Sequence, residues 1–141
     1  MYSFILTFIR IPLIGNPFVE RFYEGNPVFM TPILLCFLIS IGFIVFGFLK
    51  LKTNSALVNK MLKLTADSSL LGLVFGFLGS VIGLIGAFDG VEAIGNPSPA
   101  LFAGGLKVSL LAATFGLVTF LFARLGILIL RGLKKVEDDN E

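Results

Sequence analysis

Three long apolar stretches, separated by connections that carry most of the charge, constrain this chain more than any other feature. A helix needs about 20 mostly apolar residues to cross the roughly 30 Å hydrocarbon core of a bilayer. The sequence meets that requirement at 32–49, 70–88 and 100–130. We therefore predict an all-α integral membrane protein whose three transmembrane helices form one membrane domain over residues 31–131.

The composition excludes most other classes of protein. Of the 141 residues, 56% are hydrophobic and only 14% are charged, and there is no His and a single Cys. A soluble globular domain carries roughly a quarter charged residues. The chain offers little material for a catalytic or metal site, and one Cys permits no intrachain disulfide. We predict no enzyme activity and no cofactor, and a net charge of +2 does not indicate nucleic acid.

The distribution of Lys and Arg predicts the orientation, because positively charged connections stay in the cytoplasm. The first connection and the segment after the third span are rich in bases, whereas the second connection carries acids. The bases are Lys50, Lys52, Lys60 and Lys63 in the first connection, and Arg131, Lys134 and Lys135 after the third span. We expect the N-terminus outside and the C-terminus in the cytoplasm, with residues 132–141 as a charged tail that ends in a disordered acidic run.

The first 30 residues contain aromatic side chains at helical spacing, at Phe4 and Phe8 and again at Phe18 and Phe22. They predict one or two amphipathic helices, either lying at the outer membrane surface or packed against neighbouring subunits. Gly-Asn-Pro occurs at 15–17, 25–27 and 95–97, which we interpret as punctuation between helices. Thr31-Pro32 and Ser98-Pro99 have the pattern of a helix cap followed by the first helical residue.

Small residues recur every three or four positions along the second and third stretches. Such spacing keeps one helix face toward a partner, and small residues let backbones approach closely in lipid. The stripes consist of Gly72, Gly76, Gly79, Gly83, Gly86 and Gly90, and of Gly105, Ser109, Ala112, Gly116, Thr119, Ala123 and Gly126. The stripes either pack the two spans of one chain together or pack neighbouring chains together, or they line a central space. Because one hairpin does not require two full-length stripes of small residues, we favour a ring-shaped homo-oligomer, with the first span facing lipid.

Polar groups inside the spans are the candidates for an ion path. Ser80, Ser109, Thr114 and Thr119 carry hydroxyls that can bond their own backbone or line a wet passage. Asp67 and Asp89 only bracket the second span, so we expect no acid at membrane depth. Lys107 and Arg124 interrupt the third span; we expect them to snorkel toward water, or else to face a wet lumen or lipid headgroups.

Two segments resemble the paired motifs of the MotA/TolQ/ExbB proton-channel family. They are FGFLGSVIGLIGAF at 75–88 and AGGLKVSLLAATFGL at 103–117, and the lead-in EGNPVFM at 24–30 is similar to that of short members. The resemblance covers residues 24–130. It implies a pentamer in the bacterial inner membrane around two copies of a single-span, ExbD/TolR/MotB-like partner with an essential Asp, past which protons or sodium ions flow.

On this resemblance, Ser80 stands where the family has a pore-lining Thr in the second span. The Thr of the third span is replaced by Ala113, and Thr114 lies one residue away, about 100° around the helix. The large cytoplasmic domain of the motor proteins is missing from the first connection. Our hypothesis is an ion-driven ring subunit in which Ser80 lies near the ion path. The further candidates for that path are Thr114, Ala113 and Ser109. The alternative is a non-conducting homo-oligomeric scaffold of the same architecture.

Overall fold

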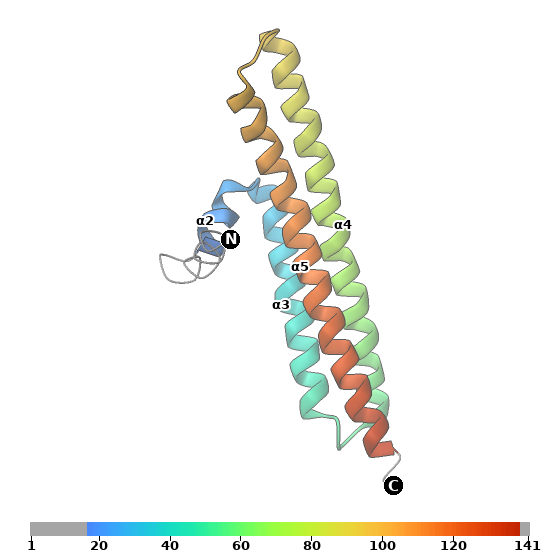
Figure 1. Cartoon of the computed structure of the whole chain (residues 1–141). Helices are drawn as coiled ribbons and strands as arrows, with labels where there is room; N and C mark the ends of the chain where they lie inside the picture. Colours follow the sequence, from blue (N-terminus) through green and yellow to red (C-terminus); the bar gives the residue numbers. More distant parts are fainter. Residues whose placement is uncertain (1–16, 139–141) are drawn as a thin grey trace.

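A computed structural model describes residues 17–138 and consists of one short helix and three long ones (Figure 1). The short helix α2 covers Pro17–Glu24, α3 covers Pro27–Leu49, α4 covers Ser55–Ile94 and α5 covers Pro99–Asp138. The three long helices are each apolar and long enough to cross a membrane. The prediction of an all-helical chain with three membrane-spanning helices is confirmed.

The helix ends show how the Gly-Asn-Pro segments act. Asn26 caps α3, its side chain accepting a hydrogen bond from the Val28 N–H, and Pro27 is the first helical residue. Gly95 ends α4 with a φ of 78°, in the left-handed region that glycine adopts most readily. The segments at 25–27 and 95–97 therefore do punctuate helices; the first, at 15–17, falls largely outside the described residues.

The predicted start of the first span at Thr31-Pro32 is wrong. The Thr31 hydroxyl bonds the Pro27 carbonyl at 2.8 Å inside α3, and Pro32 lies within the helix. The stronger start signal is five residues earlier, where Asn26 and Pro27 supply both cap and first residue. The second predicted start is confirmed, because Ser98 accepts a hydrogen bond from the Leu101 N–H through its side chain, at the beginning of α5.

Both later helices are longer than the apolar stretches that predicted them, at 40 residues each, or about 60 Å. Most of the first connection is the first part of α4, so that only residues 50–54 separate α3 from α4. The expected charged tail is helical through Asp138, and residues 139–141 of the acidic run lie outside the described part of the chain. Of the predicted N-terminal amphipathic helices, the structure describes α2; the segment with Phe4 and Phe8 lies outside the described residues.

The three long helices form one bundle in which α4 and α5 pack along most of their length and α3 packs against both. Figure 1 shows that the α4–α5 hairpin extends beyond the start of α3, and that α2 lies beside the bundle at that level. We call this the hairpin end; the opposite end, with residues 50–54 and the end of α5, is the basic end. There the buried cluster of Val58, Leu62, Ile127 and Leu130 joins α4 to α5.

Candidate functional site

The line along which α4 and α5 touch, here called the seam, has backbone in contact with backbone. A Cβ atom added to Gly76 would lie 2.8 Å from both the Gly116 Cα and the Ala112 carbonyl oxygen. One added to Gly116 would lie 2.9 Å from the Gly76 Cα. Only glycine fits at both positions, and this allows the close approach expected of small residues in a membrane.

The same stripes continue the seam in both directions. Added Cβ atoms would meet Thr119 from Gly72 at 3.0 Å, Ala112 from Gly79 at 3.2 Å, Ser109 from Gly83 at 3.0 Å and Ala87 from Gly105 at 2.9 Å. Of the residues predicted to pack, the following lie in the seam: Gly72, Gly76, Gly79, Gly83, Gly105, Ala112 and Gly116. Gly86 lies outside it, because nothing of its own chain lies within 4 Å of its added Cβ.

The two stripes meet each other within one chain. This is the simpler of the two interpretations that the spacing left open, and it uses the small residues of both helices without a neighbouring subunit. The argument that two full-length stripes need a ring is therefore not supported by the packing. Any ring must use the outward faces of the hairpin instead.

The predicted ion-path hydroxyls occupy different environments. Ser80 is 6% exposed and Ser109 is 2% exposed, whereas Thr114 is exposed and Ala113 is partly buried. Ser109 donates to the Gly105 carbonyl at 2.9 Å, and Thr114 donates to the Leu110 carbonyl at 2.9 Å. Both hydroxyls thus bond their own backbone four residues back, as an ordinary membrane helix allows.

The structure does not bring Thr114 near Ser80. Thr114 is two residues from both Ala112 and Gly116, which face α4, so it lies about 200° around α5 on the opposite face. Ala113 is nine residues from Phe122, whose ring lies 6.3 Å from that of Phe37 on α3. Nine residues are two and a half turns, so Ala113 lies on the side of α5 away from α3.

A polar cluster between α3 and α4 was missed by the sequence analysis. The Ser68 hydroxyl donates to the Cys36 carbonyl at 3.1 Å, and the Ser40 hydroxyl donates to the Ser68 oxygen at 3.2 Å. Nearby, Thr65 and Ser69 are buried and bond their own helix. Thr65, Ser68 and Ser69 share one face of a single helix, and that spacing was the available signal.

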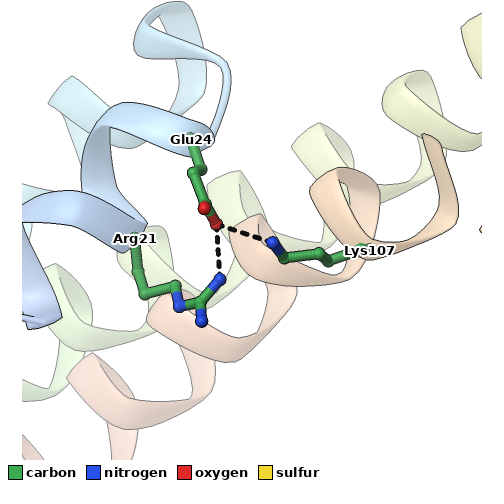
Figure 2. Close-up of polar contacts among 3 residues, drawn as sticks. All are labelled: Arg21, Glu24 and Lys107. Atoms are coloured by element: carbon green, nitrogen blue, oxygen red, sulfur yellow. Dashed lines mark hydrogen bonds and ion pairs between the residues drawn. The ribbon is translucent and has the colours of Figure 1, made fainter. Parts of the chain in front are cut away.

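Glu24, at the end of α2, binds two basic side chains (Figure 2). Its Oε2 atom lies 2.7 Å from Arg21 and 3.1 Å from the Nζ of Lys107 on α5. The hydrogen bond from Lys107, followed by that from Arg21, holds the pKa of the Glu24 carboxyl below its ordinary value of 4.5. Lys107, which was expected to snorkel toward water or to face a wet lumen or lipid headgroups, forms an ion pair with Glu24 at the end of α2.

The contacts of α3 also fix the level of two charges on the other helices. Asp67 precedes Ser68, which bonds Ser40, so Asp67 is level with Ile41 of the antiparallel α3. From Ile41 to Leu49 the helix α3 is entirely apolar and extends about 12 Å. Asp67, which was expected only to bracket the second span, is therefore level with an apolar part of α3, and the hydropathy of α4 alone does not reveal this register.

Arg124 lies at the same level. It falls midway between Phe122, which contacts Phe37, and Gly126, whose added Cβ would lie 2.5 Å from Ile44. Its guanidinium lies over the Phe120 ring, 4.8 Å from the centroid. Six residues beyond it, at 125–130, continue α5 without a charge. Arg124 thus packs on an aromatic ring of its own helix.

Two hollows lie at opposite ends of the bundle. A cavity of about 340 Å³ at the basic end is lined by Asn59, Leu62, Lys63, Arg131, Lys134 and Lys135. An apolar groove of about 610 Å³ lies between α2, α3 and α5, with Phe22, Met30 and Phe115 among its lining. Within residues 17–138, no group of three or more His, Cys, Asp or Glu residues lies close enough to hold a metal ion.

Comparison with known proteins decides the family. The sequence pattern of the MotA/TolQ/ExbB proton channel family matches residues 49–139, which is more than half of the chain and includes all of α4 and all of α5. The chain belongs to the MotA/TolQ/ExbB proton channel family. No curated protein and no solved structure matches it.

The part of the chain that matches the MotA/TolQ/ExbB family is the α4–α5 hairpin. The match contains both motif segments, 75–88 and 103–117, and therefore the whole seam. It excludes α2 and nearly all of α3, including the similar lead-in at 24–30. Three apolar helices and this match identify a multi-pass membrane protein of a channel family, rather than of an enzyme family.

Proposed function

We propose that this MotA/TolQ/ExbB protein is a subunit of a homo-oligomeric ring, a pentamer, that uses a proton or sodium gradient. The ring encloses a single-span, ExbD/TolR/MotB-like partner dimer, which supplies an essential carboxylate. The observation that carries the proposal is the family match over the complete α4–α5 hairpin. No large cytoplasmic domain lies between α3 and α4, where only residues 50–54 connect them, so the chain corresponds to the membrane core of the family.

The position of α3 supports one arrangement of such a ring. Because α3 covers one flank of the hairpin, the central space is proposed to lie against the opposite flank, which carries Ala113. Ser80 follows Gly79 of the seam and lies about 120° around α4 from Ser68, which bonds α3. The proposed ion path therefore passes Ala113 and the edge of the seam at Ser80, while Thr114 faces elsewhere.

The proposed location is the bacterial inner membrane, with the N-terminus outside and the basic end in the cytoplasm. The cavity at that end gathers Lys63, Arg131, Lys134 and Lys135, which is the distribution that the positive-inside rule requires. Anionic lipid headgroups are the natural ligands of such a basic cavity at the cytoplasmic side. Acyl chains of membrane lipids are the proposed occupants of the apolar groove between α2, α3 and α5.

The first experiment is native mass spectrometry of the complex extracted from the membrane of its own cell. Five copies with a small single-span protein are expected. A homo-oligomer without a partner mass would favour the scaffold, and a monomer would contradict the ring.

A second experiment measures ion flux in vesicles that contain the complex. Replacing Ser80 with Ala is expected to reduce flux at unchanged subunit count, because a hydroxyl on the proposed path is lost. Thr114→Val is the matched control, since Thr114 bonds its own helix on another face, and its flux should equal that of the unmodified protein. Equal flux in Ser80→Ala would exclude Ser80 from the path.

The alternative is a non-conducting homo-oligomeric scaffold, and two observations favour it. Ser80 is only 6% exposed within the single subunit, and Ala113 offers no hydroxyl at the second position of the path. An unmodified complex that shows no flux in vesicles under a proton or a sodium gradient would support this alternative.

A further inference from the structure

Asp67 and Arg124 form an unusual combination, because they are opposite charges at one level of the bundle. The register of α3 places both beside Ser40 and Ile41. Toward the basic end, α3 continues for eight apolar residues to Leu49, and α5 for six uncharged residues to Leu130. Several of these side chains are exposed, including Val45, Leu49 and Leu128, and they need an apolar environment. The level of Asp67 and Arg124 therefore falls inside helices that are long and apolar enough to cross a membrane, beside uncharged segments of α3 and α5.

Both charged side chains point out of the subunit. Asp67 is two residues from Thr65 and from Ser69, which are buried at 1% and 0% exposure, so it lies on the opposite face of α4, away from α5. Arg124 follows the buried Ala123 and is itself exposed. Within residues 17–138, Asp67 forms no hydrogen bond or ion pair, and the Arg124 guanidinium lies over the Phe120 ring of its own helix.

The two residues differ in how they can escape the membrane. An Arg side chain is long enough to snorkel toward the interface, whereas the short carboxylate of Asp67 stays near its backbone. An ionisable side chain within a span is costly unless it pairs or faces water. Lys63 lies on the same face of α4, one turn or about 6 Å nearer the basic end, and within residues 17–138 it forms no ion pair with Asp67. At the level of Asp67 itself the chain carries the cation Arg124, on a different face of the subunit.

Ring symmetry supplies such a cation. A cyclic ring whose axis runs along the membrane normal moves every residue around the axis without changing its depth. Its interfaces are heterologous, so that one face of a subunit meets a different face of the next copy. Two opposite charges on different exposed faces can therefore meet between copies only if they share one depth, as Asp67 and Arg124 do.

We propose that Asp67 of one subunit forms an ion pair with Arg124 of the adjacent copy of this chain. The inference rests on the proposed ring and adds the residues that join its subunits. It places α4 of one copy against α5 of the next. The ion pair also neutralises Arg124. This residue is two positions from Phe122 and therefore lies on the flank of α5 away from α3, where an unpaired cation would repel cations passing through the proposed central space.

Charge reversal tests the pair directly. Asp67→Arg and Arg124→Asp are each expected to lower the ring population at least about tenfold, because each puts like charges together in a desolvated interface. The double variant restores opposite charges and is expected to recover the ring. Asp89→Arg is the matched control, an exposed acid near the hairpin end of α4, and should not change assembly.

Native mass spectrometry of subunit copy number reads out all four variants and separates the possible failures. A monomeric unmodified protein would overturn the proposed ring and this pair with it. A normal ring in both single variants would overturn the pair alone. Loss of the ring in both single variants without recovery in the double variant would also overturn direct pairing.

Cross-linking provides a second test that does not depend on stability. In a Cys36→Ala background, Asp67→Cys and Arg124→Cys are placed on separate copies with different tags and expressed together. Oxidation is expected to link the two tagged copies. The combination of Asp89→Cys with Arg124→Cys, whose positions lie at different depths, should give no link. Absence of the first link in a complex of normal copy number would contradict the proposal.

Discussion

The seam between α4 and α5 and the contact between α3 and α4 hold helices together by different means. In the seam, Gly76 and Gly116 bring backbone against backbone, with no room for a single methyl group. Between α3 and α4, Ser40 and Ser68 form hydrogen bonds, and side chains of α3 such as Phe29 and Cys36 lie against glycines of α4. The seam depends on the absence of side chains, whereas α3 is held by side chains that can adjust.

The largest expected effect is therefore in the seam. Gly76→Ala places a Cβ 2.8 Å from backbone atoms of α5, which cannot move aside as a flexible side chain does. We expect a loss of about 1–3 kcal/mol, typical of overpacking in a tight core, measured as the free energy of unfolding in detergent. Gly86→Ala is the control, because its added Cβ meets nothing within 4 Å. Equal losses in both variants would contradict the importance of close approach.

A smaller effect is expected where α3 meets α4. Ser68→Ala removes the hydrogen bonds that join Ser68 to Cys36 and Ser40. Hydrogen bonds between membrane helices contribute about 0.6 kcal/mol on average, so we expect a loss of that order in the same measurement. Thr114→Val, which removes only a bond within α5, should change stability less. A loss in Ser68→Ala as large as that in Gly76→Ala would remove the distinction between the two contacts.

The smallest effect concerns α2, which is tied to α5 by exposed charges. The pKa of Glu24 is lowered in the folded protein, so its stabilising contribution is complete above the ordinary value of 4.5 and is lost as pH falls through the lower, folded value. Hydrogen exchange of α2 should be constant from pH 7 to pH 5 after correction for intrinsic rates, and should increase only in more acidic solution. In Glu24→Gln the protection should be lower at neutral pH and independent of this titration.

Much of the architecture could be predicted from the sequence. Three apolar stretches predict three spanning helices because the bilayer leaves few other solutions. The spacing of small residues identified the faces of α4 and α5 that pack, and Ser98-Pro99 identified the start of α5. These features depend on local periodicity and chain stiffness, which a single sequence records.

Features that depend on the register between helices could not be predicted. Hydropathy placed Asp67 outside the second span, and only the bonds of Ser68 reveal that it lies level with Ile41. Spacing alone could not decide whether the two stripes meet in one chain or between chains. Likewise, the pairing of Lys107 with Glu24 joins residues far apart in sequence, and no periodicity connects them.

The way the small residues are used in the seam also bears on the order of events during biogenesis. Each long helix finds its tight packing partner inside its own chain, so a newly inserted copy can reach its folded form before meeting another. Ring formation would then be a separate, bimolecular step between finished units, and its rate would depend on the density of copies in the membrane. A subunit with a defective outward face would accumulate as a folded, protease-resistant monomer rather than as a substrate for degradation.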